Sequence, residues 1–398
     1  MTMRDTSNFA PDIPTMLQRI DELRPFIAEH AAEGEKQRRV TQEVFDALAD
    51  IGVFRASLPK KYGGYAAGVR DKIELSRAVA RGDGGAGWIT TIILGNNWIL
   101  GQFPEQAQDD VFLTDPDARC SGVIPVTGRA DVVEGGYRVT GKWGYNSALG
   151  YTSWALVAAA VHDEQGEFIG TAQFAVPRDE VTEEDTWFVA GLAASDSRTV
   201  VADNVFVPEH RMLRHDTAMS GVGATENAQG FRSAFVASLS VWLIGPQLGI
   251  AEAVYDLVSE KAQSKGIAYT AYEVQADSTA VQLRIAKARL QIDTALSFAR
   301  SIGDTLDAYA ERGESPDVLT RTRMRAETGW ITENLQAAVD SLLTVHGSAA
   351  FALTNPIQRH WRDLEVAARH ALILGDVGYE MYGRALLGRA PDAVSPLI

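Results

Sequence analysis

The chain has 398 residues, 46% of them hydrophobic and 22% charged, which is the composition of a soluble enzyme with more than one domain. With 37 Lys and Arg against 52 Asp and Glu, its net charge of −15 repels nucleic-acid phosphates and anionic membrane surfaces, so we expect it to bind neither. The single cysteine, Cys120, excludes an intrachain disulfide and is typical of a reducing cytoplasm, and no cluster of His and Cys ligands indicates a metal site.

Helical periodicity runs through residues 13–112. Leu17, Ile20 and Ile27 recur at the spacing of one helix face, and Val44 and Leu48 repeat the pattern further along. The run PKKYGG at 59–64 interrupts it with the residues of a turn. The pattern predicts an N-terminal helical domain at 1–115.

Short β-rich runs follow between residues 119 and 215. The segments 137–140, 155–158, 171–176 and 199–201 are rich in Val and Thr, and Gly, Asp and Asn separate them. Beyond a segment at 220–230 that is rich in Gly and small polar residues, helical periodicity returns as far as Leu387. We therefore predict an α+β chain, with a central β domain at 116–222 and a C-terminal helical region at 223–398.

Several local motifs, in order and at matching distances, resemble the acyl-CoA dehydrogenase superfamily over nearly the whole chain. They are GVFR at 52–55 with YGG at 62–64, GGYRVTGKW at 135–143, FVPE at 206–209 and NPIQRHWRD at 355–363. The resemblance implies the acyl-CoA dehydrogenase fold, in which the C-terminal region is a four-helix bundle.

Two stretches resemble the two-component flavin-dependent monooxygenases of this superfamily. One is WGYNSA at 143–148, and the other is RHWRD at 359–363 followed by His370, where dehydrogenases carry a catalytic carboxylate. The resemblance implies a reduced-flavin-dependent monooxygenase that hydroxylates or N- or S-oxidises a small aromatic, amine or natural-product substrate through a flavin C4a-hydroperoxide. It further implies reduced FMN or FAD, O2 as co-substrate, a separate NAD(P)H-flavin reductase and a homotetramer.

Two alternatives remain at this point. One is an FAD-dependent acyl-CoA dehydrogenase whose base comes from elsewhere on the chain. The other is a flavin-free member of the superfamily that serves in binding or scaffolding. The chain has no Gly-x-Gly-x-x-Gly motif for a nicotinamide cofactor, which agrees with a reductase on a separate protein.

The resemblance assigns catalysis to Ser147 and His370. A serine hydroxyl both donates and accepts, which suits a hydrogen bond at the reactive edge of the flavin. Imidazole titrates near neutrality and can act as the acid or base. We predict that one long C-terminal helix carries residues 355–370, so that Asp363, Ala367 and His370 fall roughly on one face of it.

The resemblance also implies contacts to the flavin and the substrate. Asn96 and Asn97 stand where related phenol hydroxylases carry a histidine, and we expect them to contact the substrate. Ser197 is expected near the flavin phosphate. The charge of that phosphate could be offset by Arg211, Arg214 or Lys265. The residues expected to bind the cofactor are Trp143, Tyr145, Asn146, Ser147, Trp187, Ser197 and Gly347, the last toward the flavin of a neighbouring subunit.

Overall fold

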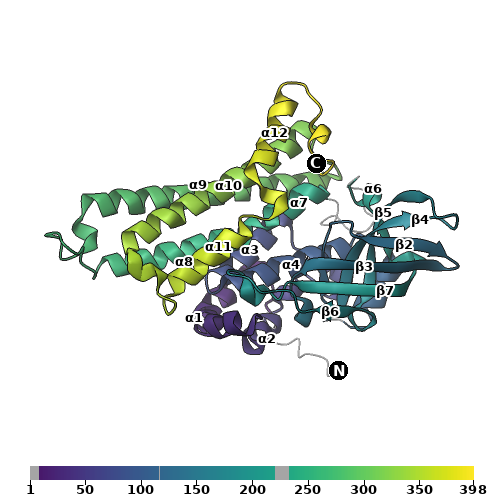
Figure 1. Ribbon diagram of the computed structural model, residues 1–398, viewed down its shortest axis with the longest axis horizontal. Coiled ribbons are helices and arrows are strands. Elements are labelled where there is room, and N and C mark those ends of the chain that lie inside the picture. The colour runs from purple at the N-terminus through teal and green to yellow at the C-terminus, as the bar shows by residue number, and fades with distance from the viewer. Residues whose placement is uncertain (1–8, 116, 220–232) are drawn as a thin grey trace.

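The computed structural model describes residues 9–115, 117–219 and 233–398, and it confirms the predicted α+β architecture (Figure 1). Helices come first, strands follow, and helices return; the predicted boundary between residues 222 and 223 lies outside the described residues. The helices are α1 Ile13–Gln37, α2 Gln42–Asp50, α3 Val69–Ala80, α4 Gly84–Leu100, α5 Glu105–Phe112, α6 His215–Met219, α7 Phe235–Trp242, α8 Ile244–Ala262, α9 Thr279–Arg312, α10 Val318–His346, α11 Pro356–Ala367 and α12 Gly375–Leu386.

One eight-stranded sheet forms the β domain, in the order β6-β7-β3-β2-β4-β5-β8, with β1 parallel to β4 outside this path. The pairing of β3 with β7 is antiparallel and has register shifts, one of them between Trp143 and Asn146. Cys120 in β1 is fully buried, and burial raises the pKa of its thiol. The strands are β1 Cys120–Gly122, β2 Gly128–Val133, β3 Gly136–Asn146, β4 Trp154–His162, β5 Phe168–Pro177, β6 Thr182–Glu184, β7 Arg198–Pro208 and β8 Met212–Arg214.

Helix α4 lies deep in the molecule, between the sheet and the bundle (Figure 1). Its N-cap is Asp83, whose carboxylate accepts a hydrogen bond from the N–H of Ala86 at 2.8 Å. Glycine opens the helix because a Cβ on Gly84 would lie 2.7 Å from a carboxylate oxygen of Asp363, and one on Gly85 would lie 2.7 Å from Cβ of Ala194. The start of α4 therefore packs closely against both α11 and the loop that precedes β7.

The C-terminal helices α8, α9, α10 and α11 pack into an elongated bundle (Figure 1). The run from Phe235 to Ala262 is long and apolar enough to cross a bilayer, but 94% of its apolar 18-residue window is buried inside the protein, as expected for a core helix. The prediction of one long C-terminal helix through His370 is wrong. Helix α11 ends at Ala367, and His370 has extended backbone angles (φ −65°, ψ 130°) before a short turn of 3-10 helix.

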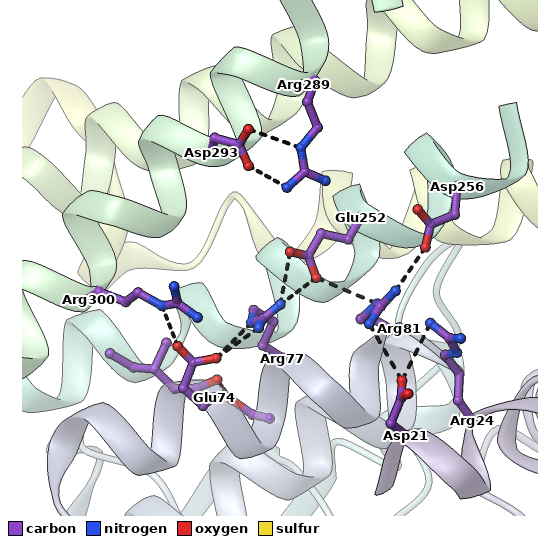
Figure 2. A network of polar contacts seen from close by, with 12 residues as sticks. Asp21, Arg24, Glu74, Arg77, Arg81, Glu252, Asp256, Arg289, Asp293 and Arg300 are labelled. Atoms are coloured by element: carbon purple, nitrogen blue, oxygen red, sulfur yellow. Dashed lines mark hydrogen bonds and ion pairs between the residues drawn. The ribbon is translucent and has the colours of Figure 1, made fainter. Parts of the chain in front are cut away.

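A network of ion pairs joins the N-terminal helices to the bundle (Figure 2). Arg77 of α3 contacts Glu252 of α8 at 2.8 Å and Glu74 of its own helix at 2.9 Å. Arg300 of α9 reaches the same Glu74 at 2.6 Å. Because the side chains of Glu74 and Glu252 are only 11% and 8% exposed, water screens these charges little. The network holds α3 against two helices of the bundle.

Candidate functional site

A chain of hydrogen bonds links α4 to the end of β3 and to the loop before β7. The indole N–H of Trp88 donates to Oγ of Ser147 at 3.2 Å, and this hydroxyl is hydrogen-bonded to Oγ of Ser197 at 2.7 Å. Ser197 is in turn bonded to Oγ of Ser195 at 2.6 Å. All four side chains are buried. Ser147 and Ser197 therefore lie side by side, and the expected contact of Ser197 near the flavin phosphate stays a prediction.

The side chain of Asn146, the residue before Ser147, makes no hydrogen bond within the described part of the protein. It is fully buried, yet neither its Oδ1 nor its Nδ2 has a hydrogen-bond partner among the described residues. An unsatisfied buried amide costs free energy, and the usual compensation is a ligand or ordered water. Asn146 lies at the register shift of β3, which turns its side chain inward. The polar edge of a flavin ring, with its carbonyls and ring nitrogens, fits this pair of donor and acceptor.

Backbone strain concentrates on the two segments that meet here. Tyr145 and Ala148 have φ values of 61° and 63°, and Leu192 and Asp196 have values of 52° and 49°, in a region that L-residues seldom adopt. The segments are joined by a hydrogen bond of 2.9 Å from the Ala148 N–H to a backbone carbonyl of the second loop. Such strain persists only where the surroundings enforce it, which is common at binding sites.

Two aromatic side chains border the serine chain. The indole of Trp187 is buried, and its N–H donates to the Leu192 carbonyl at 3.0 Å. The ring of Tyr145 meets that of Trp187 edge-on, with centroids 5.8 Å apart, but 77% of Tyr145 is exposed. The rings of Tyr145 and Trp187 therefore contact each other, and Asn146 follows Tyr145 in the chain. Most of the Tyr145 ring remains exposed.

A buried carboxyl group fixes the loop that carries Leu192. Asp363 of α11 accepts a hydrogen bond from the Leu192 N–H at 2.6 Å. Burial, and then the charge of nearby Asp83, raises the pKa of Asp363 to about 8. Asp363 is thus mainly protonated at neutral pH, and it acts on the site through the position of the loop.

His370 lies near Trp88, with the two ring centroids 6.1 Å apart. Its Nδ1 accepts a hydrogen bond from the Leu372 N–H at 3.2 Å, so in the neutral imidazole the proton is on Nε2. Burial and, to a lesser degree, the positive charge of Arg325 lower the pKa of His370 to about 4. The predicted common face with Asp363 does not exist, because the helix ends between them.

Gly347 lies apart from these residues in the single chain. It ends α10 with φ 78°, and a Cβ there would meet no atom of the described chain within 4 Å. Lys265 binds the carbonyl of His346 beside it. The other two candidate cations for a phosphate already have partners, since Arg211 pairs with Asp110 at 2.7 Å and Arg214 pairs with an aspartate at 2.9 Å.

Two of the residues expected to contact the flavin or the substrate are buried with partners inside the protein, and their ligand contacts stay predictions. Trp143 is 1% exposed in the core of the sheet, where its N–H donates to the Ala158 carbonyl at 2.7 Å. Asn97 is fully buried, donates to the Phe54 carbonyl at 3.1 Å and accepts from the Cys120 N–H at 3.0 Å, so it joins parts of the protein.

Asn96 is less fully engaged. Its Nδ2 donates to the carbonyl of Ile92 in its own helix at 2.9 Å. Its Oδ1 lies close to β1, 2.4 Å from where a Cβ on Gly122 would stand. A substrate contact at Asn96 stays a prediction.

Sequence reasoning missed Trp88 and Ser195. Almost every residue of α4 is buried, so the helix shows no polar face from which the direction of one side chain could be predicted. Ser195 belongs to none of the motifs, and its hydrogen bond to Ser197 depends on the fold of the loop before β7.

Comparison with known families matches both helical regions. The family described as "Acyl-CoA dehydrogenase, N-terminal domain" matches residues 20–115, and "Acyl-CoA dehydrogenase, C-terminal domain" matches residues 241–374.

Full-length relatives are also similar. The oxygenase subunit HsaA of a flavin-dependent monooxygenase from Rhodococcus jostii is 33% identical over 94% of this chain and 98% of its own. The oxygenase component of an FADH2-dependent resorcinol hydroxylase from a Rhizobium species is 32% identical over 91% of each chain. Among solved structures, XiaF from a Streptomyces species, in complex with FADH2 and glycerol, has a TM-score of 0.91, 32% identity and 95% coverage of this chain against 96% of its own.

Proposed function

Because the chain belongs to the acyl-CoA dehydrogenase family, in its branch of two-component flavin-dependent monooxygenases, we propose that it hydroxylates a small phenolic substrate. It is an oxygenase component, which uses reduced flavin and O2 while a separate reductase supplies the reduced flavin. The relatives are monooxygenases and hydroxylases, which supports this function over the alternative acyl-CoA dehydrogenase.

The buried, unsatisfied amide of Asn146 beside the hydroxyl chain of Ser147 carries the proposal. In our assignment Asn146 and Ser147 hydrogen-bond to the flavin ring, and Trp187 and Tyr145 pack against it. We also propose that Gly347 faces the flavin of a neighbouring subunit. Reduced flavin, when bound, supplies the electrons with which O2 is activated. FADH2 is the form bound by XiaF and used by the resorcinol hydroxylase, and we propose it here.

His370 is proposed to position the substrate oxygen. Its Nδ1 accepts a hydrogen bond from the Leu372 N–H, so Nε2 carries the proton of the neutral imidazole and donates a hydrogen bond to a substrate oxygen. The indole of Trp88 lies near this imidazole, with ring centroids 6.1 Å apart, and its N–H donates to Ser147. In our proposal the substrate oxygen therefore binds near His370 and the flavin binds near Ser147.

A single-turnover experiment tests the proposed function. Anaerobic protein with reduced flavin is mixed with oxygenated buffer and one member of a panel of simple phenols, and hydroxylated product and hydrogen peroxide are both measured. We expect product with at least one phenol. His370→Ala should lose that product while its affinity for reduced flavin stays the same. Flavin oxidation that yields only peroxide with every phenol would refute the proposed substrate class.

We further propose that the protein is a homotetramer and works in the cytoplasm. Helix α9 exposes Leu283, Leu290 and Phe298 at 67%, 66% and 37% near one face, and α10 exposes Trp330 at 50%. Large apolar side chains gathered on neighbouring helices commonly mark subunit contacts. Light scattering on the purified protein should give four times the chain mass, and Leu290→Glu should lower it; a monomeric wild-type protein would contradict the proposal.

A further inference from the structure

Arg325 of α10 is a buried cation, and most of its N–H groups make no hydrogen bond within the described residues. The residue is 5% exposed, and its Nε and Nη1 have no hydrogen-bond partner within the described parts of the chain. Its only bond recorded there runs from Nη2 to the carbonyl of Ala371 at 3.3 Å. A guanidinium offers five N–H groups and remains charged at neutral pH, although burial lowers the pKa of Arg325 to about 10.

The charge of Arg325 is not neutralised by the acidic residue nearest to it in sequence. Glu327, two positions along α10, pairs with Arg323 at 3.4 Å. Arg77 is also largely buried, but its guanidinium binds two carboxylates, whereas that of Arg325 binds none among the described residues (Figure 2). Burying a charge without a counter-ion is costly, so a native arginine in this state indicates an anion that binds to it.

The guanidinium lies at the base of the turn that presents His370. Its acceptor, Ala371, is the next residue in the chain, and the Arg325 charge acts on the His370 imidazole. With Nδ1 of His370 accepting from the Leu372 N–H, Nε2 carries the proton of the neutral imidazole and can donate a hydrogen bond. Nε and Nη1 of Arg325 have no hydrogen-bond partner among the described residues, so these two nitrogens and Nε2 of His370 are three donors that suit one anionic oxygen.

We propose that Arg325, with Nε2 of His370, binds the oxygen of an aromatic substrate as the phenolate. The proton of the hydroxyl group leaves to solvent, and the negative charge stays opposite the guanidinium. A phenolate carries more electron density on its ortho carbons than the neutral phenol, so this binding prepares the ring for hydroxylation. The inference rests on the proposed function and names the ionic form of its substrate.

4-Nitrophenol tests this inference because its phenolate absorbs visible light and its phenol form does not. The probe is added to anaerobic protein saturated with reduced flavin, in a buffer acidic enough to keep the free probe protonated. We expect the phenolate band to appear on binding to the wild-type protein. Arg325→Met should remove the band and weaken binding by about tenfold, the effect of losing hydrogen bonds to a charged group.

Arg323→Met is the matched control, since it removes a charge from the same helix at a side chain that is 48% exposed, and it should behave like wild type. Thermal melting separates binding from a structural role. Because methionine replaces an unpaired buried charge, Arg325→Met should melt at or above the wild-type temperature if the arginine serves a ligand. A lower melting temperature, or failure to fold, would show a structural role and overturn the inference.

The inference is also overturned if the wild-type protein binds no phenolate, or if Arg325→Met keeps the band. These results are distinct from failure of the proposed function, which is read from product formation by the wild-type protein. If the wild-type protein forms hydroxylated product but Arg325→Met binds 4-nitrophenolate as wild type does, only the inference on Arg325 is refuted. If the wild-type protein forms hydrogen peroxide and no hydroxylated product with every phenol, the proposed substrate class is refuted, independently of the result with 4-nitrophenol.

Discussion

The indole N–H of Trp88, on an N-terminal helix, donates to the hydroxyl of Ser147 at the end of a strand of the β domain, at 3.2 Å. The same indole ring lies 6.1 Å from the imidazole of His370, measured between centroids. Three regions of the chain thus meet at one tryptophan. The site therefore takes residues from all three regions and exists only in the complete fold.

Replacing Ser147 tests the hydroxyl chain. Ser147→Ala removes the acceptor of the Trp88 N–H and the partner of Ser197, and a hydrogen bond of this kind is worth about 1 kcal/mol or more. We expect the ratio of hydroxylated product to hydrogen peroxide to fall by about tenfold while flavin oxidation continues. Ser297→Ala, at an exposed site on α9, is the control. An unchanged ratio in Ser147→Ala would show that this hydroxyl has no part in the reaction.

Replacing Asn146 tests the flavin contact. Asn146→Leu keeps the approximate volume and removes two buried atoms without partners, so the flavin-free protein should be at least as stable as wild type. Its dissociation constant for reduced flavin should rise by about tenfold, measured anaerobically by titration. Asn334→Ala, where the amide bonds only its own helix, should leave the affinity unchanged. A destabilised variant with normal affinity would mean that Asn146 has a structural role.

Much of the fold was predictable, because its signals are periodic. Helical spacing of apolar residues and short β-rich runs gave the order of the three regions, and the family motifs gave the architecture. The end of α11 was not predictable, since residues 367–374 contain no Gly or Pro, and the C-cap Ala368 has ordinary helical angles. His370 was therefore placed on a helix that stops before it.

The candidate site was predictable only in part. The motif at 143–148 drew attention to Asn146 and Ser147. Alternation along β3 holds through Val139 and Trp143, which are both buried, and is lost at the register shift after Trp143, so the inward direction of Asn146 could not be inferred. The importance of Arg325 could not be predicted from the sequence, because a buried arginine cannot be told from an exposed one on a long helix. Whether such a charge has a counter-ion depends on residues far away in sequence.

Asp363 predicts an effect of pH on stability. Its pKa is raised to about 8 in the folded state, first by burial and then by Asp83, whereas an unfolded aspartate has a pKa of about 3.9. Between these values the folded state holds a proton that the unfolded state has lost, so this contribution to stability is complete below the unfolded pKa. It declines as the pH rises through the folded pKa.

Asparagine cannot titrate, yet its Oδ1 can still accept the Leu192 N–H. Asp363→Asn should therefore gain melting temperature relative to wild type on going from about pH 5 to about pH 9. Asp203→Asn, at an exposed position of β7, should show no such trend. Equal differences in melting temperature at the two pH values would contradict the raised pKa.

The ion-pair network predicts unequal costs for two acidic residues of α8. Glu252 is buried against Arg77, and Glu252→Ala leaves that guanidinium with one carboxylate, so the free energy of unfolding should fall by about 3 kcal/mol. Asp256 is 51% exposed beside Arg81, and Asp256→Ala should cost about 1 kcal/mol or less. Urea denaturation measures both, and similar costs would show that burial does not strengthen the network.

The burial of Cys120 has a practical consequence for spectroscopy. The only thiol of the chain is fully covered within the sheet domain, and its raised pKa keeps it as the unreactive thiol form. A cysteine introduced at an exposed position such as Leu387, which is 80% exposed, would then be the single group that reacts with a maleimide dye. The native sequence can therefore carry a site-specific fluorescent reporter without prior removal of a competing cysteine.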